Sequence, residues 1–355
     1  MKARSHKAQT RVSVPHRHRL ARSVAVTSDW CGTDTLVCAA RQALSCILFL
    51  LIAATSEARI FVTSERAGTV TMIDGATMKT IAVGTRPRGI VLSPDGKRLY
   101  VAVSHFRGQF SKTADGVVAI DPRTLTIIRR YKAGTDPEGI AITPDGKRFC
   151  VANEDAGTAS IVDAGSGRHV SLVTGTEPEG VAASYDGTLI YVTAETSNTV
   201  TVIDPKNNAV VANIFVDARP RAAVFARDGV RAYVSSEVCG SINVVDVKKN
   251  RAIAHIKLRP ADHPVGVVLS PDGKRLYAAT GRGNAVAVID TATNRVLQYI
   301  AVGNRPWGIN VTHDGRTLYT ANGLSNDVSV IDTASGRVTA TIKVPDGPWG
   351  IAVAP

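Results

Sequence analysis

Residues 304–344 read NRPWGINVTHDGRTLYTANGLSNDVSVIDTASGRVTATIKV, and this stretch determines the expected fold. It contains four short runs rich in apolar and β-branched residues, and these are separated by HDG, by a Gly- and Asn-containing loop and by SGR. Alternating runs joined by such turn residues predict antiparallel hairpins. No part of the stretch carries ten residues at helical spacing. The stretch therefore predicts one four-stranded antiparallel sheet.

The same unit recurs seven times along the chain, and each copy begins with a five-residue phrase around a proline. The phrases are TRPRG at 85–89, TDPEG at 135–139, TEPEG at 176–180, ARPRA at 218–222, DHPVG at 262–266, NRPWG at 304–308 and DGPWG at 346–350. Their prolines, Pro87, Pro137, Pro178, Pro220, Pro264, Pro306 and Pro348, are 50, 41, 42, 44, 42 and 42 residues apart. A period in the forties with four strands per repeat is typical of a β-propeller.

The two ends of the repeat region complement each other. The chain stops one strand into the seventh repeat, and the missing three strands are supplied by RIFVTSE, TVTMID and TIAVG, which follow residue 58. Pairing of the C-terminal strand with these three would close the ring and remove an exposed sheet edge. We therefore expect an all-β, seven-bladed propeller over residues 59–355, with four antiparallel strands per blade.

Residues 1–58 are expected to be an N-terminal extension and a signal peptide. An apolar region covers residues 43–54, and small residues precede a cleavage point after Ala58. The apolar region is shorter than the roughly 20 residues that cross a bilayer, so no stable membrane anchor is expected. The formal net charge of +12 includes a basic excess within this extension and does not by itself specify nucleic acid. The expected location is the periplasm.

An aspartate and a tyrosine recur at fixed places in the repeats, and both places have structural explanations. The aspartates are Asp74, Asp121, Asp163, Asp204, Asp246, Asp290 and Asp332. They stand just before turn sequences, which favours Asx turns over metal binding. Cys150 takes the place that tyrosine holds in other repeats, so we expect it to be a buried packing thiol. Cys150 and Cys239 fall in non-neighbouring repeats and are expected to be free thiols.

The repeats resemble those of the YVTN β-propeller family over residues 59–355. Forms of the name motif stand at 191–193 (YVT) and 100–102 (YVA). The phrases EPEG at 177–180, RPR at 219–221, SSE at 235–237, HPVG at 263–266, NGLSNDVSVID at 322–332 and PWGIAV at 348–353 are similar to a seven-repeat subgroup associated with PQQ-dependent alcohol catabolism and a linked ABC transporter. The resemblance implies a periplasmic protein partner, either a quinoprotein dehydrogenase or a transporter component. It leaves the cofactor unknown.

The residues that differ between repeats at equivalent positions are the candidates for function. In propellers the turn into the inner strand and the loop after the second strand lie on one face, around the mouth of the central channel. The turns place Arg86, Arg88, Glu138, Glu179, Arg219, Arg221, His263, Arg305, Trp307 and Trp349 there. The second loops add Glu65, Glu154, Glu195 and Glu237. Acidic residues on one side and Arg and Trp on the other suit a small anionic or zwitterionic ligand, although the charges can also pair across neighbouring blades.

The first repeat is longer than the others because residues 104–116 are inserted after its second strand. Extra length in one repeat maps to a loop, often on the binding face. The candidate residues of this loop are His105, Phe106, Arg107 and Phe110. They could cover the mouth or meet a partner, and a tolerated surface insertion is the alternative.

Sequence motifs of enzymes are absent, since the chain has no GxSxG, P-loop, HExxH or CxxCH sequence. We therefore expect a periplasmic, non-enzymatic binding or scaffolding propeller, accessory to PQQ-dependent alcohol oxidation or to the linked transporter.

Three alternatives stay open. The first is a metal-assisted hydrolase or lactonase-like enzyme at the channel mouth, with a divalent ion among Glu138, Glu154, Glu179 and Glu195. The second is a haem d1-type propeller, with an axial ligand chosen from His105, His263 and His313. The third is binding of single-stranded nucleic acid by the Arg and Trp residues, which export to the periplasm disfavours.

Overall fold

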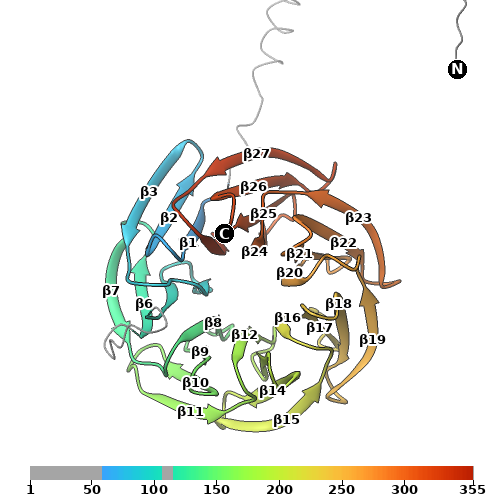
Figure 1. Ribbon diagram of the computed structural model, residues 1–355. Helices are drawn as coiled ribbons and strands as arrows, with labels where there is room; N and C mark the ends of the chain where they lie inside the picture. Colours follow the sequence, from blue (N-terminus) through green and yellow to red (C-terminus); the bar gives the residue numbers. More distant parts are fainter. Residues whose placement is uncertain (1–57, 106–114, 355) are drawn as a thin grey trace, which may run out of the picture. The chain divides into compact units, whose positions relative to one another are not determined.

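The structure, a computed structural model, describes residues 58–105 and 115–354, and these form seven four-stranded antiparallel sheets arranged as a ring (Figure 1). Blade 1 contains β4 (Ile90–Leu92), β5 (Leu99–Val103), β6 (Gly116–Asp121) and β7 (Thr126–Tyr131). Blade 2 contains β8 (Pro137–Ile142), β9 (Arg148–Asn153), β10 (Thr158–Asp163) and β11 (His169–Val173). Blade 3 contains β12 (Pro178–Ala183), β13 (Ile190–Ala194), β14 (Thr199–Asp204) and β15 (Ala209–Phe215).

The remaining blades repeat this order. Blade 4 contains β16 (Pro220–Phe225), β17 (Arg231–Ser236), β18 (Ser241–Asp246) and β19 (Arg251–Lys257). Blade 5 contains β20 (Pro264–Leu269), β21 (Arg275–Thr280), β22 (Ala285–Asp290) and β23 (Arg295–Ala301). Blade 6 contains β24 (Pro306–Val311), β25 (Thr317–Asn322), β26 (Asp327–Asp332) and β27 (Arg337–Lys343). Blade 7 contains β28 (Pro348–Val353), β1 (Ile60–Ser64), β2 (Thr69–Asp74) and β3 (Thr77–Ala82).

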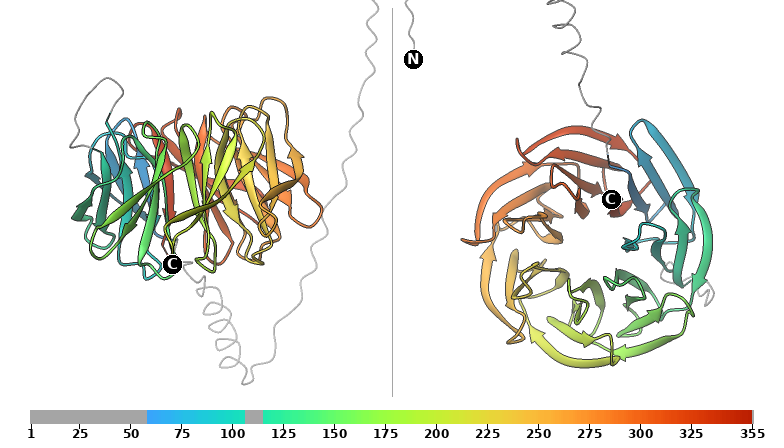
Figure 2. Two further views of the ribbon diagram at one scale, coloured as in Figure 1. Left: turned by 90° about the horizontal axis from the view of Figure 1, so that it is seen from below. Right: turned by 180° about the vertical axis from the view of Figure 1, so that it is seen from behind.

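Blade 7 closes the ring, as the sequence predicts. β28 pairs antiparallel with β1, with Ile60 opposite Val353 and Val62 opposite Ile351. Two backbone hydrogen bonds extend the pairing beyond the strands, from the N–H of Ala354 to the carbonyl of Arg59 and from the N–H of Glu65 to that of Gly347. The innermost strand of each blade faces the central channel, and the strands run between the two faces of the ring (Figure 2).

The core lies between adjacent blades, because the second and third strands of each sheet are buried on both faces. Aromatic residues at the recurring tyrosine position bridge neighbouring blades. The rings of Tyr191 in blade 3 and Phe225 in blade 4 lie 4.3 Å apart, and those of Tyr100 and Phe149 lie 4.9 Å apart. Cys150 is fully buried, and burial raises the pKa of its thiol to about 12. The predictions of a packing thiol at Cys150 and of free thiols at Cys150 and Cys239 are confirmed.

The glycine that ends six of the seven five-residue phrases is required by close packing around the channel. A Cβ added to Gly266 would lie 2.5 Å from the backbone oxygen of Trp307, and one added to Gly350 would lie 2.6 Å from that of Arg88. Each glycine thus allows the inner strand of the next blade to approach at backbone distance. Blade 4 carries Ala222 instead.

The recurring aspartates form Asx turns in six of the seven blades. For example, Asp290 Oδ1 accepts the N–H of Ala292 at 3.1 Å, and Asp332 Oδ1 accepts that of Ser335 at 2.7 Å. Asp74 is the exception, because β2 and β3 are joined by a two-residue turn at Gly75, which has φ +54. Its carboxylate instead binds Arg59 at 2.7 Å.

Among residues 58–105 and 115–354, no helix is long and apolar enough to cross a membrane. The predicted extension, signal peptide and cleavage after Ala58 involve residues 1–57, which lie outside the described residues.

Candidate active site

The two predicted sets of loops lie on the same face of the ring. In blade 2 the N–H of Glu154 donates to the carbonyl of Asp136 at 2.9 Å, and in blade 3 the N–H of Glu195 donates to the carbonyl of Glu177 at 2.9 Å. The same backbone bond recurs in blades 4 to 7, and in blade 1 the N–H of Ser104 donates to the carbonyl of Thr85, one residue earlier. The loop after the second strand is therefore tied to the turn that precedes the inner strand.

The residue before each repeated proline adopts a left-handed conformation. These residues are Arg86 (φ 43), Asp136 (φ 50), Glu177 (φ 55), Arg219 (φ 60), His263 (φ 49), Arg305 (φ 57) and Gly347 (φ 74). A positive φ is energetically unfavourable for any residue that has a side chain, and such backbone strain clusters at functional sites. Six of the seven blades keep a charged or imidazole side chain at this strained position.

The residues that follow the prolines form a second circle at the mouth, and five of the seven line the central cavity. They are Arg88, Glu138, Glu179, Arg221, Val265, Trp307 and Trp349. A cavity of about 300 Å³ lies inside this circle. Its charged side chains are Glu179 and Arg221, which belong to blades 3 and 4, and its lining also contains Asn310, Trp307 and Trp349. A cavity of this size suits a small organic molecule.

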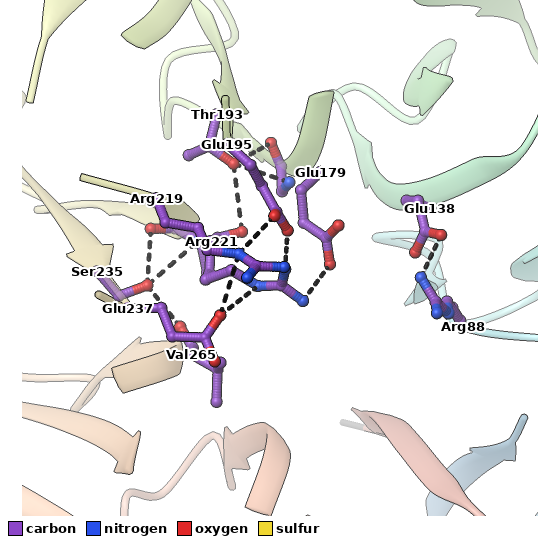
Figure 3. Close-up of polar contacts among 12 residues, drawn as sticks. Arg88, Glu138, Glu179, Thr193, Glu195, Arg219, Arg221, Ser235, Glu237 and Val265 are labelled. Carbon is purple, nitrogen blue, oxygen red and sulfur yellow. Dashed lines mark hydrogen bonds and ion pairs between the residues drawn. The ribbon is translucent and has the colours of Figure 1, made fainter. Parts of the chain in front are cut away.

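Arg221 is the centre of a buried ion-pair network (Figure 3). Its Nη2 lies 2.8 Å from Glu179 Oε1, its Nη1 contacts Glu195 Oε1, and its Nε lies 3.8 Å from Glu237 Oε2. The Arg221 side chain is only 9% exposed. Arg219 binds the same Glu195 with its Nε at 2.6 Å, but its side chain is 49% exposed.

Arg305 completes this network from blade 6. Its Nη2 lies 3.1 Å from Glu237 Oε1, and its guanidinium stands 4.3 Å from the centre of the Trp307 ring. Burial lowers the pKa of Arg305, and the positive charges of Arg282 and Arg221 act in the same direction. Trp307 and Trp349 are stacked with centroids 6.4 Å apart. Arg305 and Arg221 therefore both stand over the Trp307 ring, which is one of the two indoles in the lining of the cavity.

A separate network joins blades 7, 1 and 2. Arg86 Nη1 lies 2.8 Å from Asp136 Oδ1, Arg88 Nη2 lies 2.9 Å from Glu65 Oε1, and Arg88 Nη1 contacts Glu138 Oε1. Burial and the nearby charge of Glu179 raise the pKa of Glu138 well above its ordinary value, against the effect of Arg88. Burial also raises the pKa of Glu154. The sequence left open whether the charges at the mouth pair across blades. The structure contains such pairs.

The acidic set predicted around one ion is divided between these networks. Glu179 and Glu195 bind Arg221, whereas Glu138 and Glu154 lie together with Asp136. The division arises because Arg221 follows Pro220 and enters between the carboxylates of blades 3 and 4.

The three histidines considered as axial haem ligands lie in different parts of the fold. His313 belongs to the turn between β24 and β25, which is at the opposite end of the blade from the mouth. His105 Nδ1 lies 2.8 Å from Asp115 Oδ1, and the backbone carbonyl of His105 accepts a bond from Arg86. His263 precedes Pro264 at the mouth. Phe106, Arg107 and Phe110 of the insertion lie outside the described residues.

Sequence reasoning missed two features of the site. Asp136 was not among the candidate residues, although its carboxylate is 1% exposed and bound to Arg86. Hydroxyl groups on the second strands also bridge adjacent inner strands: Ser235 Oγ donates to the carbonyl of Val265 at 2.5 Å, and Thr63 Oγ1 donates to that of Arg88 at 2.7 Å. The recurrence of Ser or Thr at this strand position was the available signal.

The fold and the mouth define a seven-bladed β-propeller with a small, charged and indole-walled central cavity. Residues 210–355 match the family described as "Lactonase, 7-bladed beta-propeller", and residues 105–262 match the "Choice-of-anchor I domain". Each match covers less than half of the chain. A search of curated proteins found no match.

Several solved structures share the fold. The periplasmic gluconolactonase of Pseudomonas aeruginosa is 20% identical, with a TM-score of 0.70 over 84% of this chain and 99% of that one. A putative 6-phosphogluconolactonase from Bacteroides fragilis is 22% identical, with a TM-score of 0.68 over 85% and 99%. The dihydro-heme d1 dehydrogenase NirN is 18% identical, with a TM-score of 0.60 over 86% and 78%.

These comparisons correct the expected function. The non-enzymatic binding or scaffolding role is wrong, because the family match over residues 210–355 is to a lactonase. Among the readings that the sequence allowed, the findings favour the lactonase-like enzyme. A motif search could not indicate this function, because the charged groups at the mouth come from different blades and form no local motif. The predicted protein partner stays a prediction.

Proposed function

We propose that the chain is a lactonase-like hydrolase that opens a small lactone in the central cavity. The observation that carries the proposal is the buried pair of Glu179 and Arg221, 2.8 Å apart, in the wall of a 300 Å³ cavity that faces two indoles. The family match supports it independently, and it includes Arg221.

The pair can supply both requirements of ester hydrolysis. Glu179 accepts a proton from a water molecule that attacks the lactone carbonyl carbon, and Arg221 stabilises the oxyanion that forms. The bond from the carbonyl carbon to the ring oxygen then breaks, and Glu179 returns the proton to that oxygen. The product is an open hydroxy acid. Trp307 and Trp349 offer apolar faces for the C–H groups of the ring.

Replacing Glu179 with Gln is expected to lower kcat for lactone hydrolysis about 100-fold or more, because the amide cannot accept the proton. The measurement is a pH-stat assay on a panel of small lactones, beginning with glucono-δ-lactone, corrected for spontaneous opening.

Glu177→Gln is the matched control, because Glu177 stands two residues earlier in the same turn and its carboxylate contacts Thr196 outside the cavity. This variant should keep the full rate. No hydrolysis above the spontaneous rate on any lactone, or an unchanged rate in Glu179→Gln, would refute the proposal.

We also propose that the propeller works in the periplasm. The apolar region at 43–54 and the small residues before position 59 support export, and one of the similar structures is a periplasmic gluconolactonase. Mass spectrometry of the protein recovered from a periplasmic extract should find Arg59 as the first residue. Recovery of the chain from the cytoplasm with residues 1–58 intact would contradict export.

A further inference from the structure

The end of the ring opposite the mouth carries exposed basic side chains in neighbouring blades (Figure 2). Each inner strand starts at the mouth, so the turns that join first to second strand and third to fourth strand lie at the other end. We call this end the turn face. Its turns in blades 1 to 6 contain Lys97, Lys147, Lys206, Lys249, Lys274 and Arg316. Four of these side chains are 63–78% exposed, those of Lys97, Lys249, Lys274 and Arg316.

The aspartates of the turn face are held close to the backbone by their own turns. Asp272 Oδ1 accepts the N–H of Lys274 at 3.0 Å and the hydroxyl of Ser270 at 2.6 Å. Asp246 Oδ1 likewise accepts the N–H of Lys249 at 3.0 Å. An aspartate has one methylene group in its side chain, whereas a lysine carries its charge on a flexible four-carbon stem. The charges that extend furthest from this face are therefore positive.

The excess of positive charge on this face is largest in blade 4. Residues 226–231 and 246–251 contain Arg227, Arg231, Lys248, Lys249 and Arg251. The two carboxylates in these ranges bind Arg231 at 3.6 Å and Lys249 at 3.2 Å. Within the part of the chain that the structure describes, no carboxylate forms an ion pair with Arg227 or Lys248. These two side chains can therefore bind an anion from outside the chain.

Two apolar side chains are exposed beside these cations. Tyr185 lies in the turn between β12 and β13, Val230 lies in the turn between β16 and β17, and each is 47% exposed. The guanidinium of Arg227 stands 4.8 Å from the centre of the Tyr185 ring. A tyrosine ring suits the boundary between lipid headgroups and acyl chains, because it is apolar at one end and polar at the other. A soluble polyanion offers no apolar layer to such a side chain.

The chain enters the ring at the same face. β28 runs from the mouth to the turn face, and β1 starts beside its end, with Ile60 opposite Val353. The apolar region at 43–54 ends shortly before Arg59 in the sequence. The step from position 54 to position 59 spans at most about 18 Å. A bilayer that holds the apolar region during export is therefore close to the turn face.

We propose that the turn face docks on the surface of an anionic phospholipid bilayer. Tyr185 and Val230 then lie at the level of the headgroups, and the cations of blade 4 and its neighbours bind lipid phosphates. Each Lys or Arg near an anionic membrane surface strengthens binding about 5-fold. The mouth faces away from the membrane and stays open to the solvent. This docking goes beyond lactone hydrolysis and does not depend on it.

The test is sedimentation of the protein with vesicles of phosphatidylglycerol and phosphatidylcholine in equal parts, compared with vesicles of phosphatidylcholine alone. The chain used begins at Arg59, because the region at 43–54 would bind lipid by itself and all strands of the ring follow residue 59. We expect binding to the mixed vesicles only. It should disappear when NaCl is raised from 0.1 M to 1 M, because the Debye length falls from about 10 Å to about 3 Å. No sedimentation with the mixed vesicles at the lower salt concentration would overturn the proposal.

Two triple variants with the same net charge show whether one face is responsible. The first combines Lys248→Gln, Lys249→Gln and Lys274→Gln on the turn face. The control combines Lys132→Gln, Lys257→Gln and Lys343→Gln, which are exposed at the mouth ends of β7, β19 and β27. The first should bind the mixed vesicles about 100-fold more weakly than the parent, and the control should bind nearly as tightly as the parent. Equal weakening in both would reduce the effect to net charge and contradict docking through the turn face.

Tyr185→Ser separates a bilayer from a soluble polyanion. The variant should bind the mixed vesicles several-fold more weakly, because the ring no longer enters the headgroup layer. Its weaker attraction to dextran sulfate, which has no apolar layer, should equal that of the parent. If dextran sulfate binds the parent as tightly as the vesicles do and Tyr185→Ser changes neither affinity, the partner is a soluble polyanion and the bilayer proposal is wrong.

Discussion

Deletion of residues 348–355 is expected to abolish the cooperative unfolding transition of the propeller. β28 would be lost, and with it the buried side chains of Ile351 and Val353. Ile60 and Val62 of β1 would lose their cover at the same time. At about 1.5–3 kcal/mol for each of these four side chains, the loss is about 6–12 kcal/mol. That value is comparable to the whole stability of an ordinary domain, about 5–15 kcal/mol.

Circular dichroism during heating measures the effect, and a circular permutant gives the control. In the permutant, residues 348–354 are placed before Arg59 through a short Gly-Asn linker, which converts β28 and β1 into a hairpin with the native register. The permutant should recover the transition that the deletion loses. A deletion variant that melts within a few degrees of the complete chain would show that ring closure contributes little.

The blade architecture could be predicted from sequence because each of its elements is local. The four strands, their turns and the Asx aspartates such as Asp290 lie within about forty residues, and the repeat displays the same pattern seven times. Closure of the ring could be predicted because the last repeat has one strand and the N-terminal end of the repeat region supplies the other three. Cys150 was placed correctly because equivalent positions in other repeats hold large buried side chains. The expectation was wrong for Asp74, where the turn has only two residues and the carboxylate binds Arg59 instead.

The site could be predicted only in part, because its chemistry arises between blades. Repeat alignment identified the positions of Arg221, Glu195 and Glu237, but not that one guanidinium would enter among carboxylates from two blades. The direction of that side chain depends on the left-handed residue Arg219 before Pro220, and sequence alone favours extended backbone before proline. The expected division into an acidic and a basic side was therefore only partly right.

Arg221→Met is expected to cost about 3–5 kcal/mol of unfolding free energy, because it leaves the buried carboxylates of Glu179 and Glu195 without their main cation. Arg219→Met is the matched control. Arg219 belongs to the same turn and binds the same Glu195, but its side chain is half exposed, so its loss should cost no more than about 1 kcal/mol. Guanidinium chloride unfolding of both variants gives the two free energies.

A compensating variant separates the charge of Arg221 from its packing. Adding Glu179→Gln and Glu195→Gln to Arg221→Met removes the unpaired charges while keeping side chains of similar size, so most of the lost stability should return. If stability does not return, Arg221 supports the fold through its contacts with the Trp307 ring, 5.5 Å from its guanidinium, and the ion pairs contribute little. Equal costs for Arg219→Met and Arg221→Met would likewise contradict the view that burial gives this network its strength.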